Sequence, residues 1–182
     1  MIRRSYDQSD VLEKDFFNEV FDESFSLVAF IMNRFMVDHF IRAGRALVES
    51  DYESLIIFAV LAHQNVAHMM RPGSFPGDVL TERGRLPDME GGLRSLRLRD
   101  LTQITGLPRE TVRRKLKRLE GWRLIMRVGA GWQASTARVE SDLREFTRES
   151  VYRFLNCGRE IGAAFADVRN KRQPPTQKIK VG

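Results

Sequence analysis

LPRETVRRKLKRLEG, residues 107–121, is the stretch from which the rest of the chain can be interpreted, because it carries two patterns at once. Six of its fifteen residues are basic. Leu107, Val112, Leu116 and Leu119 recur at spacings that place apolar side chains along one side of a helix. Such a helix buries one stripe and leaves a dense positive face in solvent.

The preceding residues predict a second, shorter helix and a tight turn. Residues 98–104, LRDLTQI, have helical spacing, and Gly106 can adopt the left-handed conformation that ends a helix. Pro108 suits the first turn of the next helix, where its missing N–H costs nothing. Two helices joined in this way are typical of a helix-turn-helix, with a small core formed by Leu101, Ile104, Leu107, Val112, Leu116 and Leu119.

A β-hairpin is expected directly after these helices. Two β-prone stretches, 122–128 and 132–134, flank the glycine turn 129–131. Leu96 can supply a short strand that pairs with the hairpin. We therefore expect a mainly α fold: a winged helix-turn-helix with a small β-hairpin wing, flanked by N-terminal helices and a long C-terminal helix.

The segment QITGLPRETVRRKLKRLE, residues 103–120, resembles the winged helix of the Crp family, in which a Gly, a Ser and an Arg-Glu-Thr-Val-x-Arg run occupy the turn and the recognition helix. Pro108 replaces the usual Ser, and Lys115 replaces a usually apolar residue. The N-terminal half shows no pattern of a cyclic-nucleotide-binding β-domain. In overall layout the chain is similar to the MarR family, which implies a dimer built by the terminal helices.

The resemblance implies that Arg109, Glu110 and Arg114 read bases and that Thr111 contacts a phosphate. With the apolar stripe facing inward, Arg113 and Lys117 are also exposed. Arginine can donate two hydrogen bonds to guanine, and glutamate can accept from cytosine. Glu110 could alternatively pair with Arg113 or Arg114 along the helix, and both roles can coexist. We expect base contacts from Arg109, Glu110, Arg113 and Arg114, and phosphate contacts from Arg97, Thr111, Lys117 and Arg127.

The charge of the chain is concentrated in its centre. Residues 94–127 hold 11 Lys/Arg and 3 Asp/Glu, a net charge of +8. Residues 1–93 hold 9 and 15, and residues 128–182 hold 10 and 6. An ordinary solvated surface mixes signs, so this asymmetry favours an anionic partner, which we take to be double-stranded DNA.

The remaining segments are expected to be helices and connections. A helix from about Glu23 to Val48 precedes a second one over 52–70, which a capping box of Ser50 and Glu53 would start. Ser141 would cap a C-terminal helix extending to Val168. The expected divisions are a helical region for dimerisation and sensing over 1–70, a linker over 71–92, the winged helix over 93–136, a dimerisation helix over 137–169 and a disordered basic tail over 170–182.

Several classes of function find no support in the sequence. The single cysteine, Cys157, excludes an internal disulfide, and we expect it to be buried and inert. We find no phosphate-binding Gly-rich loop, catalytic triad or metal-ligand spacing. His63 and His68 are five residues apart, which does not place them on one helix face, so with His39 they predict no metal site. We therefore expect no enzyme activity, no metal and no cofactor. The N-terminus lacks a signal peptide, and the longest apolar run is short, so we expect a cytoplasmic protein without a membrane span.

The expected function is that of a DNA-binding transcriptional regulator acting as a homodimer. Two alternatives stay open: an adaptor whose winged helix binds protein, and a sensor whose N-terminal helices bind a small-molecule effector. The residues that could line such an effector pocket, which we expect to be core or dimer contacts, are Phe30, Met32, Phe35, Met36, Phe40, Met69 and Met70.

Overall fold

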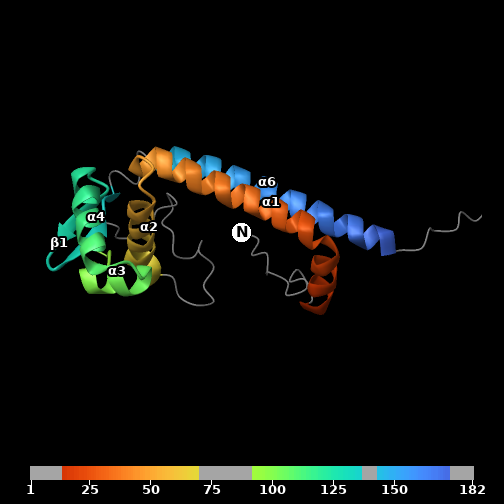
Figure 1. Ribbon diagram of the computed structural model, residues 1–182, viewed down its shortest axis with the longest axis horizontal. Helices are drawn as coiled ribbons and strands as arrows, with labels where there is room; N and C mark the ends of the chain where they lie inside the picture. The colour runs from red at the N-terminus through yellow and green to blue at the C-terminus, as the bar shows by residue number, and fades with distance from the viewer. Residues whose placement is uncertain (1–13, 70–91, 137–142, 173–182) are drawn as a thin grey trace, which may run out of the picture. The chain divides into compact units, whose positions relative to one another are not determined.

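The structure is a computed structural model that describes residues 14–69, 92–136 and 143–172, and it divides into two compact units. Unit 1 comprises residues 1–39 and 150–182, and unit 2 comprises residues 40–149. The described chain is mainly helical with one small antiparallel sheet, as predicted. Its elements are α1 (Lys14–Val48), α2 (Tyr52–Ala67), α3 (Leu98–Thr105), α4 (Arg109–Gly121), β1 (Ile125–Val128), β2 (Gly131–Ala134) and α6 (Arg144–Arg172) (Figure 1).

Helices α3 and α4 are joined by the predicted tight turn. Gly106 has a φ of +68°, the left-handed conformation expected of it. The Thr105 hydroxyl donates to the Leu101 carbonyl over 2.7 Å and accepts from the Leu107 N–H over 3.3 Å, which fixes the path of the turn. Pro108 is the N-cap residue of α4, so it precedes the first turn in which it was expected.

The core of unit 2 lies between α2, α3, α4 and the hairpin. Four of the six predicted core residues of the two short helices are buried, and Leu107 is partly buried. Ile104 was predicted wrongly: 48% of its surface is exposed, because α3 is short and its C-terminal end borders an open cleft instead of the core. The buried side chains at the centre are Ile57, Leu61, Leu101, Val112, Leu116, Leu119, Leu124 and Ile125.

The start of α2 was predicted at the correct residue, but with the wrong cap. Asp51, not Ser50, is the N-cap: its Oδ1 accepts from the Ser54 N–H over 3.3 Å. Ser50 has a φ of +65° and Glu49 a φ of +50°, so both belong to the turn that leaves α1. The Ser50 hydroxyl therefore lies one residue too early to cap the helix.

The predicted hairpin is present, and Leu96 pairs with it as predicted, but as a single bridge and not as a strand. Strands β1 and β2 pair antiparallel with Ile125 opposite Ala134. Leu96 and Trp132 exchange two backbone hydrogen bonds of 3.0 and 2.9 Å, which form this isolated bridge. A Cβ at Gly131 would lie 2.8 Å from the Leu96 carbonyl oxygen, so this close approach requires glycine.

A buried asparagine that the sequence analysis did not single out ties the hairpin to α2. Asn65 is 1% exposed, and its side-chain amide donates to the Arg94 carbonyl over 2.6 Å. Its Oδ1 accepts from the Ala134 N–H over 2.8 Å. One side chain thus satisfies two backbone groups that secondary structure leaves unpaired, and the hydrogen bond from the Ala134 N–H is buried.

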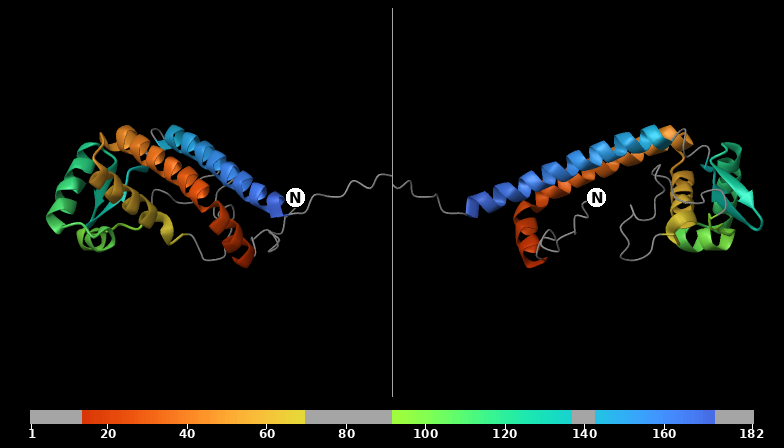
Figure 2. Two further views of the ribbon diagram at one scale, coloured as in Figure 1. Left: turned by 45° about the vertical axis from the view of Figure 1, so that its right-hand side comes forward. Right: turned by 180° about the vertical axis from the view of Figure 1, so that it is seen from behind.

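In unit 1, α1 and α6 lie side by side and antiparallel (Figures 1 and 2). Helix α1 already includes Lys14, so it does not begin near Glu23 as predicted. Ion pairs join Arg34 to Glu160 and Arg153 to Asp38. The buried residues of this helix pair are few and mostly small: Val20, Ser24, Val28, Ile31, Cys157 and Ala164.

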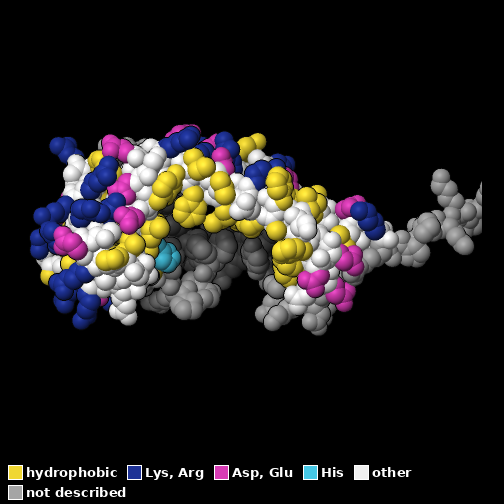
Figure 3. Space-filling view, in the orientation of Figure 1, with side chains coloured by type: hydrophobic (Ala, Val, Ile, Leu, Met, Phe, Trp, Pro, Cys, Tyr) yellow, Lys and Arg dark blue, Asp and Glu magenta, His cyan; other side chains and the backbone are white. Residues whose placement is uncertain are grey.

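The same helix pair exposes many large apolar side chains, which Figure 3 shows along α1. Phe30 is 62% exposed, Tyr152 61% and Leu155 60%. By length and composition alone, Phe17–Val48 could cross a membrane, a test that helices buried in soluble proteins also pass. The further large apolar residues exposed in unit 1 are Phe17, Phe25, Leu27, Met32, Met36, Val37, Val151 and Phe154.

Several predicted features lie outside the described residues. These are the Ser141 cap, nearly all of the linker 71–92 and residues 173–182 of the tail. Helix α6 continues to Arg172, beyond the predicted end near Val168.

Replacing Asn65 by Ala would leave the Arg94 carbonyl and the Ala134 N–H buried without their partner. We expect the free energy of unfolding to fall by about 1–3 kcal/mol, the usual cost of such unpaired groups. Urea denaturation measures this, with His63→Ala, an exposed position on the same helix, as the matched control. Equal stability of the two variants would contradict the role given to Asn65.

Candidate nucleic-acid interface

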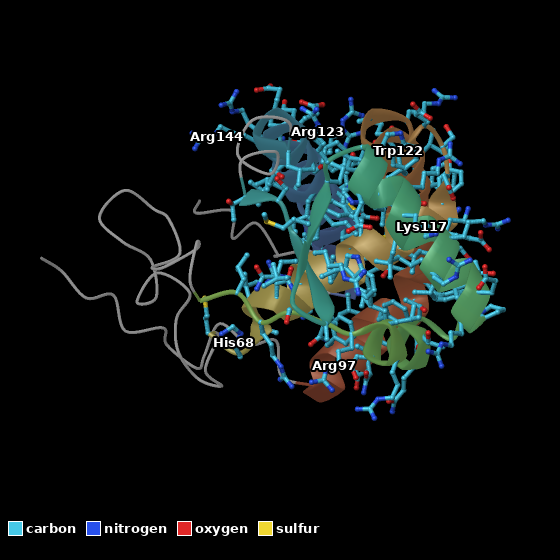
Figure 4. All side chains as sticks on the ribbon, turned by 90° about the vertical axis from the view of Figure 1, so that its left-hand side faces the viewer. His68, Arg97, Lys117, Trp122, Arg123 and Arg144 are labelled. Carbon is cyan, nitrogen blue, oxygen red and sulfur yellow. The ribbon has the colours of Figure 1, made fainter. Side chains whose placement is uncertain are left out.

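Helix α4 has two opposite faces. Val112, Leu116 and Leu119 are buried against the core, as the spacing predicted. Residues at positions i, i+3, i+4 and i+7 share the opposite, solvent-exposed face. These residues are Glu110, Arg113, Arg114 and Lys117, and Figure 4 shows Lys117 pointing away from the core.

The carboxylate of Glu110 is held by its neighbour along the helix. Arg113 donates from Nε to Glu110 Oε2 over 2.8 Å, and from Nη2 to Oε1. These hydrogen bonds lower the pKa of Glu110 below its ordinary value, so the group is a carboxylate at neutral pH. The alternative that we left open for Glu110, an ion pair along the helix, is therefore present. A base contact by Glu110 stays a prediction, and it would have to share the carboxylate with Arg113.

Three predicted contact residues of α4 form no ion pair with the acidic side chains that the structure describes. Arg109 and Arg114 are exposed in the N-terminal half of α4, and Lys117, also exposed, follows one turn later. Within the described residues, no acidic side chain forms a salt bridge with any of the three. The outward face therefore carries a net positive charge even after the pair of Glu110 and Arg113 is counted as neutral.

The other two basic residues of α4 have a different role. Lys115 is 12% exposed, and its ammonium lies 2.6 Å from Asp51 Oδ1 and 3.0 Å from Glu53 Oε2. Arg118 contacts Asp51 Oδ2 at 3.1 Å and Glu49 Oε2 at 3.3 Å, and its guanidinium lies over the Trp122 ring. These acidic residues belong to the turn between α1 and α2 and to the first turn of α2. Lys115 and Arg118 are thus committed to contacts inside unit 2.

Asp51 is the residue in contact with α4 that the sequence analysis missed. Its side chain is 7% exposed and faces both Lys115 and Arg118. Burial alone would raise the pKa of Asp51, but hydrogen bonds from Lys115 and Ser54 outweigh this and lower that pKa below its ordinary value. One signal could have revealed the pair: helical spacing places Lys115 beside the buried stripe of α4, where a lysine needs an acidic partner.

Three predicted phosphate contacts do not lie on the exposed face of α4, and their side chains differ in exposure to solvent. Arg127 on β1 is exposed, and its guanidinium lies 5.5 Å from the centre of the Trp132 ring, which orients it along the hairpin. Thr111 is half-buried in the first turn of α4. Arg97 is exposed at the N-cap of α3, where its N–H donates to Asp100 over 3.1 Å (Figure 4).

Two further arginines, absent from our predicted set, lie beside Arg97. Arg94, Arg97 and Arg99 border an open cleft of about 560 Å³ between the end of α2 and α3. The acidic residue of this cleft, Asp100, lies 3.7 Å from Arg99. The cleft extends the positive surface of unit 2 beyond α4, and Figure 3 shows that many Lys and Arg side chains lie on this unit.

Other candidate residues do not come together. In the described part of the chain, no group of three His, Cys, Asp or Glu side chains is placed to hold a metal ion. His63 and His68 are exposed, and the His39 ring stacks on Phe35. Cys157 is buried, as predicted.

Comparisons with protein families, with curated proteins and with solved structures find no match for this chain. The functional argument therefore rests on the residues and geometry described above.

Proposed function

We propose that this chain is a sequence-specific, double-stranded DNA-binding transcriptional regulator that acts as a homodimer. Helices α3 and α4 would form the helix-turn-helix of a winged helix, with the hairpin β1–β2 as the wing. The recognition helix, residues 108–120, would enter the major groove, whose width admits an α-helix.

The observation that carries this proposal is the division of α4 into one buried and one charged face. The apolar stripe of α4, Val112, Leu116 and Leu119, is buried in the core of unit 2. Lys115 and Arg118 form ion pairs inside the same unit. Arg109, Arg114 and Lys117 form no salt bridge within the part of the chain that the structure describes. Unpaired basic side chains on an exposed helix face match an anionic, grooved partner such as duplex DNA.

The residues of this surface would divide between base and phosphate contacts. Arginines on the N-terminal turns of a recognition helix reach base edges, and Arg114 lies centrally on the exposed face. The proposed base contacts are Arg109, Glu110, Arg113 and Arg114. The proposed phosphate contacts are Arg97, Thr111, Lys117 and Arg127, to which the cleft adds Arg94 and Arg99.

The proposed homodimer rests on the apolar surface of unit 1. Two helices packed together bury only one stripe of each, and here that stripe consists of mostly small residues. Unit 1 exposes eleven large apolar side chains. Monomeric soluble proteins rarely expose large apolar patches, and such patches mark interaction sites. A second copy would cover them by forming a bundle of four helices, two from each chain.

A second copy fits this surface better than a lipid bilayer does. The ion pairs Arg34–Glu160 and Arg153–Asp38 join α1 to α6, and Arg34 lies near the middle of the apolar segment Phe17–Val48. Charged side chains are costly at the centre of a bilayer. In a dimer, the same groups would lie at the polar edge of the bundle.

Arg114→Ala should relax the preference for one base pair in the bound sequence. If the guanidinium makes a bidentate contact, the loss should be about 1–3 kcal/mol on the preferred duplex and much smaller on a duplex changed at that base pair. Fluorescence anisotropy with both duplexes measures the two affinities. Arg45→Ala removes the same charge from an exposed position on α1 and is the matched control. An equal loss on both duplexes would make Arg114 a phosphate contact.

Phe30→Lys and Leu155→Lys should each convert the dimer into a monomer, because each places a charge on the apolar surface that the second copy would cover. Light scattering of the full chain gives the mass. Asn170→Lys adds the same charge at an exposed polar position of α6 and should leave the dimer intact. A wild-type chain that is monomeric, or that partitions into lipid vesicles, would refute the proposed dimer.

A further inference from the structure

Asp51 joins three parts of unit 2 through one carboxylate. It caps α2 by accepting from the Ser54 N–H, and it accepts a second hydrogen bond of 2.9 Å from the Ser54 hydroxyl. It also accepts from Lys115 over 2.6 Å and from Arg118 over 3.1 Å. The turn between α1 and α2, the start of α2 and the middle of α4 therefore meet at this side chain.

The contacts from α4 lie on one flank of the helix. Lys115 and Arg118 are three residues apart, so they form a row between the buried stripe and the exposed face. Glu53 and Glu49 extend the acidic row opposite them, at 3.0 Å from Lys115 and 3.3 Å from Arg118. Two basic side chains, within one turn of α4, are thus matched to three acidic ones.

These contacts restrict rotation of α4 about its own axis more tightly than the apolar core does. Val112, Leu116 and Leu119 form a single stripe, and hydrophobic burial is non-directional, so it resists separation of α4 more than its rotation. Charge-assisted hydrogen bonds are short and directional. A buried ion pair adds little net stability compared with an apolar replacement, whereas fixing one arrangement is its best-attested use.

We infer that Asp51 is a positioning residue that, through Lys115 and Arg118, sets the rotation of α4 about its axis and thereby the base preference of its exposed face. This inference rests on the proposed function, because base preference exists only if α4 reads DNA. Arg114 must meet a base edge within hydrogen-bond distance, so even a small rotation of α4 would weaken discrimination before it abolished binding.

The test compares three variants of the full chain. Asp51→Asn keeps a good N-cap but removes the charge. Lys115→Met keeps the aliphatic stem and the helix propensity but removes the ammonium. Ser54→Ala is the matched control, because it removes one hydrogen bond to Asp51 and weakens the start of α2, but keeps the Asp51 charge and the side chains of both ion pairs with α4.

The first readout is the ratio of affinities for the preferred duplex and for duplexes with single base-pair changes. We expect Asp51→Asn and Lys115→Met to lower this ratio roughly five-fold or more, a partial loss of what one good base contact provides. Ser54→Ala should lower the melting temperature and leave the ratio unchanged. Ratios unchanged in both charge variants, with each protein folded at the assay temperature, would overturn the inference. If Asp51→Asn does not fold, Lys115→Met decides the question, because it leaves the cap in place.

The second readout needs no DNA, so it separates this inference from the proposed function. Amide hydrogen exchange reports local opening of α4. We expect exchange over 112–118 to become several-fold faster in the two charge variants and to stay unchanged in Ser54→Ala. A wild-type chain without base preference would refute the proposed function, while unchanged exchange in all variants would refute the positioning role of Asp51.

Discussion

The one-sided burial of α4 is the constraint on which the rest of unit 2 depends. Val112, Leu116 and Leu119 have to be covered, and α2, α3 and the hairpin together provide that cover. Once this stripe is buried, helical periodicity decides which of the remaining residues of α4 face the solvent. The positive face is therefore a geometric consequence of the core, and the proposed DNA contacts follow from it.

The number of basic residues in α4 overstates the positive charge that is available to a binding partner. The sequence places six basic residues between Leu107 and Gly121, but the structure assigns two of them to acidic partners near the start of α2. A third basic residue, Arg113, forms an ion pair with Glu110, which neutralises its charge. The charge that remains is concentrated at Arg109, Arg114 and Lys117, and this smaller set gives the surface its potential for directional contacts. Charges without protein partners on an exposed helix are those available to phosphates and base edges.

Much of the fold could be predicted because its signals are local. Gly106 marks the turn, the 129–131 glycines mark the hairpin, and the leucine spacing marks α4. The failures come from tertiary contacts that no local pattern encodes. Ile104 has the spacing of a core residue but borders a cleft, and Asn65 is an ordinary helix residue until Arg94 and Ala134 meet it. Lys115 looked like a departure from an expected pattern, and the positions of Asp51 and Glu53 account for it.

The most direct test of the central claim is selection of bound duplexes from a random DNA pool by the full chain, at about 0.15 M salt, where weak phosphate attraction is largely screened. The account predicts a consensus with two-fold symmetry, whose half-sites are separated by about 34 Å, one turn of B-DNA, or by a multiple of that distance. Retention of DNA without any consensus would contradict base reading by α4. The absence of retained DNA would contradict the proposed function as a whole and would favour a protein partner for the exposed face of α4.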